Sequence, residues 1–187
     1  SAATYVAYQT LYTHIKWGVT SQGKFQIEAY NPVTNEGMIY YLGSGVAGHQ
    51  ISHSMGVEID WVETKNLDAA VAWFVTNSAG KYLSYTTAAQ SSFDVISSFT
   101  DSNIIFGTNG SINAVDQEHI MYYKCKSETF TIGTYTGTGV AGNFVETKDV
   151  NGVARRPARV IIKAVSGTGS WLVFNNTSSF GAVMFLD

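Results

Sequence analysis

The chain has 187 residues, of which 45% are hydrophobic, 13% aromatic and only 13% charged. Its 11 basic and 14 acidic residues give a net charge of −3, which argues against a protein that binds nucleic acid or anionic lipid through a positive excess. The length suffices for a sizeable core. The many tyrosine, phenylalanine and glycine residues argue against intrinsic disorder, a coiled coil and collagen.

The single cysteine, Cys125, excludes a disulfide framework within the chain and a zinc site built from several thiolates. We expect it to be a half-buried thiol in a strand rather than a nucleophile. No stretch reaches the ~18 apolar residues of a transmembrane helix, so we expect no membrane insertion. Residues 1–4 show no basic region followed by an apolar run, and the sequence therefore predicts no signal peptide.

Strand patterns dominate the chain. Residues 25–29 and 57–61 alternate apolar and polar side chains, so each predicts a strand with one buried face. Continuous apolar runs predict strands covered on both sides, and these runs lie at residues 71–75, 160–162, 171–174 and 182–186. Turn formers separate the segments, and many short strands with turns about every ten residues predict an all-β sandwich or jelly roll.

The chain contains an internal duplication. Residues 41–48 read Tyr-Leu-Gly-Ser-Gly-Val-Ala-Gly, and residues 135–142 match them at six of eight positions. Two further blocks align in the same order, and they pair residues 14–30 with 119–135 and residues 62–77 with 160–175. His14 and His119 hold equivalent positions, which favours a shared packing role.

The third aligned block predicts that one hairpin occurs twice. Residues 66–72 alone could form a helical turn, but the aligned residues 164–170 are rich in glycine and serine and are typical of a hairpin connection. We therefore expect a strand, a short loop and a strand in each copy. The strands are predicted at residues 59–65 and 72–76, and again at 159–165 and 170–174.

This duplication divides the chain into an N-terminal arm (residues 1–12), a first β repeat (13–117) and a second, truncated β repeat (118–187). The second copy lacks a counterpart of residues 88–117. A sandwich without its last strands has an unpaired edge and an uncovered core face, which are costly in water. The N-terminal arm, a merger of both copies into one sandwich, or a neighbouring subunit would each cover them.

The second copy resembles a known repeat. Residues 130–142 follow the pattern aromatic-x-x-Gly-x-Tyr-x-Gly-x-Gly, residues 156–163 contain Pro-Ala-x-Val-x-Ile-Lys, and residues 169–175 form a Trp-containing strand. This order is similar to the tandem β-rich repeat domain of unknown function in bacteriophage tail and other virion structural proteins. In the first copy, residues 81–83 resemble its Lys-Tyr-Leu segment, but residues 59–61 depart from Pro-Ala. The resemblance implies a virion component and assigns no catalytic residue.

Two constellations that suggest chemistry have simpler explanations. His49 and His53 are four residues apart, a spacing that separates them by about 13 Å in a strand, so we expect no metal site. Glu58 and Asp60 would suit the acid and base of a glycoside hydrolase, but the second copy lacks both carboxylates, and a solvated strand face is the better explanation. We predict no catalytic residue, no metal and no cofactor.

All three arginines gather in one short segment, with a lysine nearby. Arginine makes forked contacts with carboxylates, so the cluster is a candidate contact for an acidic partner subunit, with a solvated turn as the alternative. The candidates for this partner interface are Lys148, Arg155, Arg156 and Arg159.

Aromatic side chains offer a second candidate surface. Trp73 and Trp171 are equivalent in the repeat and lie inside apolar runs, so we expect both in the core. The aromatic residues expected on an exposed surface, where they would stack on a glycan, are Trp17, Tyr40, Tyr41 and Tyr85.

We therefore predict a non-enzymatic bacteriophage virion structural protein, made in the host bacterial cytoplasm and assembled on the tail or capsid exterior. Its expected partners are other virion proteins and copies of itself, and no nucleic acid. Such interfaces bury more than ~1,000 Å². The alternatives are a capsid decoration protein, a host-surface polysaccharide-binding adhesin and, last, a glycan hydrolase that uses Glu58 and Asp60.

Overall fold

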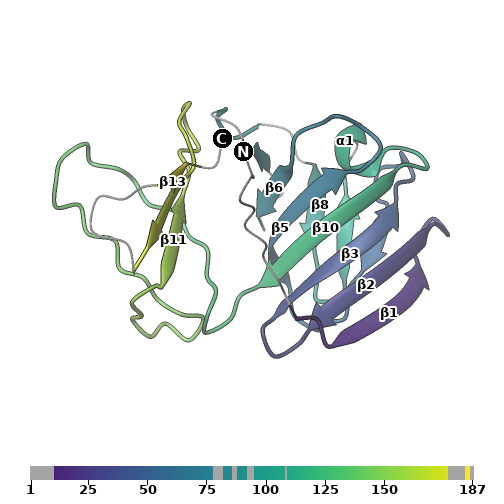
Figure 1. The fold of residues 1–187 in the computed structure, drawn as a ribbon, viewed down its shortest axis with the longest axis horizontal. Coiled ribbons are helices and arrows are strands. Elements are labelled where there is room, and N and C mark those ends of the chain that lie inside the picture. Colours follow the sequence, from purple (N-terminus) through teal and green to yellow (C-terminus); the bar gives the residue numbers. More distant parts are fainter. Residues whose placement is uncertain are drawn as a thin grey trace, which may run out of the picture.

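Three antiparallel sheets make up almost all of the regular structure, so the predicted all-β class is confirmed (Figure 1). The structure is a computed structural model. It describes residues 11–77, 82–85, 88–91, 95–107, 109–176 and 184–185. Several predicted positions lie outside these ranges, namely residues 1–10 of the N-terminal arm and residues 81, 182, 183 and 186.

The largest sheet has seven strands in the order β1-β2-β3-β10-β5-β6-β7. The strands are β1 His14–Val19, β2 Phe25–Asn31, β3 Glu36–Leu42, β10 Glu118–Cys125, β5 Ile59–Asn66, β6 Phe74–Asn77 and β7 Tyr82–Ser84. The first strand of the predicted second repeat, β10, lies inside this sheet between β3 and β5. Residue 118 therefore does not separate two sheets, and the division into repeats stays a prediction about the sequence.

A second sheet covers the inner face of the large sheet and completes a sandwich. Its strands are β4 Gln50–Ser52, β9 Asn103–Phe106 and β8 Ile96–Phe99, in that order. A four-residue helix, α1 Gly110–Asn113, follows β9, and the side chain of Asn109 caps it by accepting a hydrogen bond from the Ser111 N–H. The core between the sheets includes Ile39, Tyr41, Val62, Phe74, Met121, Ile51, Ile96, Ile104, Phe106 and Ile112.

A third sheet, with the order β11-β12-β13, stands beside the sandwich at the left of Figure 1. Its strands are β11 Arg159–Ile162, β12 Leu172–Asn175 and β13 Met184–Phe185. Residues 126–158 lead to it without a strand, apart from one isolated bridge between Lys148 and Ala154. A second core cluster joins the two parts, because Trp171 packs with Val75 and Leu83 of the large sheet.

The hairpin that the sequence predicts twice is present twice, and equivalent residues pair in the two copies. In β5–β6, Trp61 pairs with Asn77, and in β11–β12 Arg159 pairs with Asn175, each 98 residues later. Its loop contact also recurs, since Lys65 Nζ donates to the Val71 carbonyl and Lys163 Nζ donates to the Gly169 carbonyl. The first aligned block differs, because residues 130–135 form no strand where the first copy has β2.

Candidate functional site

An apolar surface lies on the outer face of the first strands of the large sheet. On β1, Ile15, Trp17 and Val19 are 70%, 68% and 67% exposed. Side chains of directly paired residues lie on the same face of a sheet. Trp17 pairs with Ile27 and Ile27 pairs with Tyr40, so the surface continues from β1 across β2 to β3. We call this surface the β1–β3 outer face, and it consists of Ile15, Trp17, Val19, Phe25, Ile27 and Tyr40.

Three of its aromatic rings form a row across the strands. The ring centroids of Trp17 and Phe25 are 5.8 Å apart, and those of Phe25 and Tyr40 are 6.1 Å apart. The planes are inclined by 57° and 69°, so the first pair is tilted and the second meets edge to face. The structure thus brings together two of the predicted glycan-contact residues, Trp17 and Tyr40, and adds Phe25.

The other two predicted glycan-contact residues lie elsewhere. The expectation that Tyr41 is exposed is wrong: it is completely buried, because a shift of one residue along β3 turns a side chain to the opposite face. Its hydroxyl donates to the Ile112 carbonyl at 2.6 Å, and its ring stacks on His119 with centroids 5.0 Å apart. Tyr85 is half-buried against Trp171, at a centroid distance of 5.1 Å, and burial raises its pKa.

The two repeat-equivalent tryptophans differ in environment. Trp171 is 2% exposed and belongs to the second core cluster, as predicted. Trp73 is only half-buried and stacks on Tyr122 of β10 at a centroid distance of 6.0 Å. The expectation of a core position is therefore confirmed for Trp171 and wrong for Trp73.

The predicted arginine cluster is divided between an internal contact and exposed positions. Arg155 Nε donates to Asp149 Oδ2 at 2.8 Å, and this hydrogen bond lowers the pKa of Asp149. Asp149 also accepts from the main-chain N–H groups of Asn151 and Val153, so it organises the turn after Lys148. All four candidates are nevertheless exposed. Lys148 pairs with Glu146 at 2.7 Å, and Arg156 and Arg159 lie at either end of the approach to β11.

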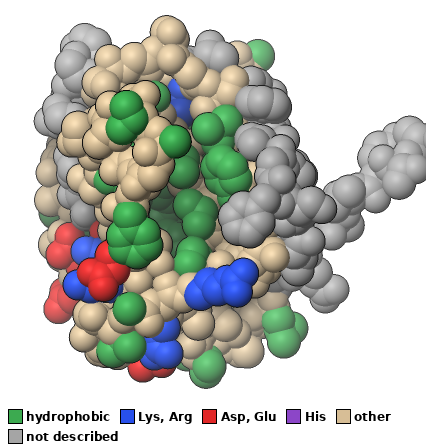
Figure 2. Space-filling view, turned by 90° about the vertical axis from the view of Figure 1, so that its left-hand side faces the viewer, with side chains coloured by type: hydrophobic (Ala, Val, Ile, Leu, Met, Phe, Trp, Pro, Cys, Tyr) green, Lys and Arg blue, Asp and Glu red, His purple; other side chains and the backbone are tan. Residues whose placement is uncertain are grey.

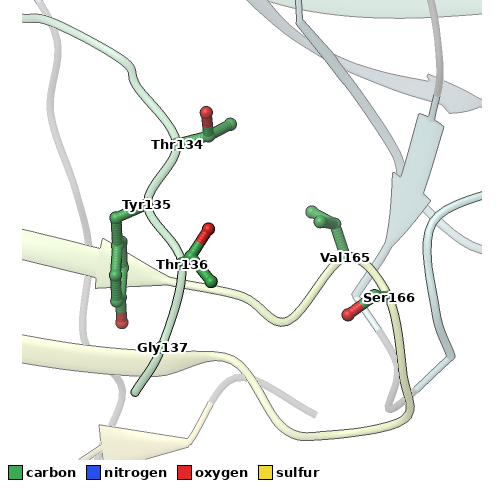
Figure 3. A pocket seen from close by; sticks show the side chains of 6 residues that line it. All are labelled: Thr134, Tyr135, Thr136, Gly137, Val165 and Ser166. Atoms are coloured by element: carbon green, nitrogen blue, oxygen red, sulfur yellow. The ribbon is translucent and has the colours of Figure 1, made fainter.

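A cleft lies between the large sheet and the third sheet. Its apolar lining consists of Trp61, Val75, Leu83, Ile132, Ile161, Val165 and Trp171, and Asn77, Gln90, Thr134 and Lys163 add polar groups. The narrow part encloses about 110 Å³ and opens into a wider hollow between residues 134–137 and 165–166 (Figure 3). Figure 2 faces this end of the molecule and shows hydrophobic side chains gathered in a hollow, with basic side chains below it.

Glu58 and Asp60 do not share one environment. Glu58 is exposed just before β5, whereas Asp60 is 3% exposed, with its Oδ1 3.6 Å from Lys126 Nζ. The prediction of a solvated strand face is therefore wrong for Asp60. The pairing of β5 with β10 is irregular at Cys125, next to this position, and the irregularity changes which side chains turn inward.

A buried carboxylate connects three parts of the sandwich. Glu28 of β2 is 1% exposed and accepts three hydrogen bonds. Its Oε1 accepts from the Tyr123 hydroxyl at 2.6 Å and from the Ser54 N–H at 2.8 Å, and its Oε2 accepts from the Ser54 hydroxyl at 2.6 Å. Hydrogen bonds of this kind compensate for the removal of a charged carboxylate from water.

Burial favours the neutral form of three histidines. In His49, His53 and His119 burial lowers the pKa, and one ring nitrogen bonds an oxygen of Asn113, Thr100 and Gln117, respectively. The other ring nitrogen of each is buried with no hydrogen-bond partner among the described residues. Protonation would leave an unpartnered N–H in the core, which explains the direction of the shift.

Cys125 is completely buried, and burial raises the pKa of its thiol to about 12. Within the described ranges, no three His, Cys, Asp or Glu side chains are grouped as ligands for a metal ion. No described helix combines the length and the hydropathy needed to cross a membrane.

Among the strands that the sequence analysis did not predict, which also include β3, β4, β8, β9 and β10, β1 matters most for the β1–β3 outer face. The signal was present, because Ile15, Trp17 and Val19 alternate with His14, Lys16 and Gly18. Interpreting residues 14–15 only as part of a repeat block concealed this alternation. The strand contributes half of the β1–β3 outer face.

A family model for a domain of unknown function, DUF7483, matches residues 29–184. The match covers most of the chain and extends across the boundary between the two predicted repeats, so the chain belongs to this family. No curated protein and no solved structure matches the chain. The family description names no activity, partner or location, and the resemblance of residues 130–175 to a phage repeat stays a prediction.

Proposed function

We propose that this member of the DUF7483 family is a non-enzymatic structural subunit of a bacteriophage virion, which assembles through its exposed β surface. The bacteriophage part of the proposal rests on the resemblance of residues 130–175 to a repeat of virion structural proteins. The assembly part is carried by one observation, the β1–β3 outer face, whose three β1 side chains are each about two-thirds exposed.

The physical argument concerns contiguity. Single exposed apolar residues are normal, but contiguous apolar patches are rare on soluble monomers and mark interaction sites. Here Ile15, Trp17 and Val19 occupy consecutive outward positions of one strand, and Phe25 and Tyr40 continue the patch across β2 and β3. Burying these side chains against a neighbour would contribute about 1.5–3 kcal/mol for each fully covered side chain.

Particle purification tests this function. Virions released from the bacterium that makes the chain are separated by density gradient and probed with an antibody against the chain. We expect the chain in the particle fraction, on the tail or on the capsid as located by immunogold labelling, which separates the tail and decoration alternatives. A chain found only among free proteins would contradict the proposal.

A matched pair of variants tests the surface. Val19→Lys places a charge on the β1–β3 outer face and should reduce incorporation into particles at least tenfold. Val33→Lys is the control, because Val33 is 87% exposed in the turn between β2 and β3, away from that face. Equal incorporation of both variants would show that the outer face is not the contact.

The aromatic row favours a second function, a host-surface polysaccharide-binding adhesin. Sugar rings stack on exposed aromatic faces, and Trp17, Phe25 and Tyr40 form a row of such rings across three strands. On an array of bacterial polysaccharides, an adhesin would bind specific glycans, lose this binding on Trp17→Ala and retain it on Tyr135→Ala, which alters a half-exposed ring in a separate loop. A chain that binds no glycan on the array is no adhesin of this kind.

A further inference from the structure

The strand β1 leaves one edge of the seven-stranded sheet open. All six of its residues are exposed, and among the described residues its only strand partner is β2. Two other outer strands are closed by local contacts. Ser91 N–H donates to the Tyr82 carbonyl of β7, and the Gln26 side chain bonds both the N–H and the carbonyl of Ser52 in β4. Open edges are templates for another strand.

The hairpin register shows which main-chain groups face outward. Thr20 N–H donates to the Lys24 carbonyl at 2.7 Å, which closes the turn between β1 and β2. Main-chain groups alternate in direction along a strand, so the even-numbered residues of β1 bond to β2. The N–H and C=O groups of Ile15, Trp17 and Val19 therefore point away from the sheet, toward the open edge.

The usual protection of an edge by lysine is weak in this strand. Lys16 lies on the inner face of β1, opposite Glu28 of β2, and its Nζ donates to Ser54 Oγ at 3.4 Å. The ammonium group thus leans back over its own sheet. The other inner-face position in the middle of the strand is Gly18, which has no side chain.

We infer that β1 pairs antiparallel with β1 of a second copy of this chain, about a twofold axis at Trp17. The inference rests on the proposed assembly role of β1, and it adds the partner and the register. A twofold axis normal to the sheet places the inner face of one copy beside the inner face of the other. Two opposed residues must therefore both have even numbers or both have odd numbers. Only three central positions keep most of the strand paired, and these are Lys16, Trp17 and Gly18.

The central position at Trp17 is selected by charge and by hydrogen bonding. With Lys16 at the centre, the two Lys16 side chains would oppose each other on one face. With Gly18 at the centre, Ile15 would have no opposing residue in the partner strand. With Trp17 at the centre, Ile15 opposes Val19, Lys16 opposes Gly18, and all three outward-pointing residues of each strand form main-chain hydrogen bonds.

This register also extends the apolar surface. The two Trp17 side chains lie side by side on the outer face, and each continues into the row with Phe25 and Tyr40 of its own copy. The exposed side chains of Ile15 and Val19 cover one another across the axis. The same neighbour thus pairs the main-chain groups of the open edge and covers part of the apolar patch.

A cysteine scan of the full-length chain tests both the partner and the register. By light scattering, the wild-type protein should have about twice the 20.3 kDa mass of one chain. On mild oxidation Trp17→Cys should form a disulfide-linked dimer, because directly opposed residues have Cα atoms about 5.5 Å apart. Lys16→Cys and Gly18→Cys should form little disulfide-linked dimer. In this register position 16 of one copy opposes position 18 of the other, so neither cysteine would face a second cysteine. The wild type is the background, as its single cysteine is buried.

Val19→Lys and the control Val33→Lys complete the test. Val19→Lys should shift the dissociation constant of the dimer by at least tenfold with an unchanged circular dichroism spectrum, and Val33→Lys should not. A monomeric wild type overturns the inference, and so does a Lys16→Cys or Gly18→Cys chain that cross-links as well as Trp17→Cys. The particle fractionation described above is independent of these outcomes. A monomeric chain can still be found in virions, and a dimeric chain can be absent from them, so the two proposals fail separately.

Discussion

The indole nitrogen of Trp171 donates a hydrogen bond to the main-chain carbonyl of Ser84 at 2.9 Å. Trp171 immediately precedes β12 of the third sheet, and Ser84 ends β7 of the large sheet, 87 residues earlier. The same indole packs on Val75 and Leu83 and meets Trp61 with ring planes at 88°. One side chain thus supplies both apolar and polar contacts between the two parts of the chain.

Trp171→Ala should therefore destabilise the protein by about 3–5 kcal/mol, the range for truncating a buried aromatic residue. Urea unfolding followed by tryptophan fluorescence measures this change. The control is Trp73→Ala at the repeat-equivalent position, where the ring is only half-buried and its contact with Tyr122 contributes about 1 kcal/mol. Similar losses in the two variants would show that Trp171 is not the main link to the third sheet.

The buried histidines should make the protein acid-sensitive. Burial lowers the pKa of His49, His53 and His119 in the folded state, while histidine in the unfolded chain has a pKa of about 6.5. The unfolded state then binds more protons below that pH, so stability is full above about pH 6.5 and falls as the pH drops toward the folded values. Thermal melts over a pH series should show the melting temperature decreasing in this window.

Two variants identify the source of that acid sensitivity. His119→Gln should reduce the slope of melting temperature against pH below about pH 6.5, whatever its effect at neutral pH. His14→Gln should leave the slope unchanged, since His14 is exposed and stacks on Tyr30 at the edge of the sheet. A slope that is identical in wild type and His119→Gln would mean that other groups control the acid response.

Glu28→Gln should destabilise the protein by about 1–3 kcal/mol. The amide nitrogen of glutamine would face one of the three donors that the carboxylate accepts, from Tyr123 and Ser54, and leave it unsatisfied. Chemical denaturation at neutral pH measures the loss. Glu146→Gln is the control, because its pair with Lys148 is about half exposed and contributes at most about 1 kcal/mol.

Arg155 and Arg156 should behave differently although they are adjacent. Arg155→Ala removes the contact with Asp149, whose side chain is completely buried, and should increase hydrogen exchange over residues 147–155. Arg156→Ala should leave this exchange unchanged, because Asp149 bonds Arg155 and not Arg156. Equal exchange in both variants would show that Asp149 holds the turn through its main-chain hydrogen bonds alone.

The predictions that succeeded were those set by local pattern. Alternation locates β2, continuous apolar runs locate β11 and β12, and the repeat excludes a helix at residues 66–72. The structure adds that the two hairpins share one register, because Trp61 with Asn77 and Arg159 with Asn175 are aligned pairs and the register of a hairpin is determined by its loop.

The predictions that failed concern features determined by contacts between residues that are distant in sequence. No local feature of residues 118–125 indicates that β10 inserts between β3 and β5, since that order depends on the closure of the whole sheet. Likewise, Tyr40 and Tyr41 are identical in sequence terms, and only the partner strand determines which of them is exposed. The burial of Asp60 depends on an irregularity in the pairing with β10 that the sequence does not reveal.

The difference between the two edges of the seven-stranded sheet has a consequence for stoichiometry. A sheet that can grow at both sides polymerises into fibres, but here β7 already accepts a hydrogen bond from Ser91, whereas β1 is open among the described residues, so this sheet would grow by a single addition at β1. The pair would then be a closed, finite building block rather than the start of a filament. Further attachment through this sheet would then have to use side-chain contacts instead of strand addition.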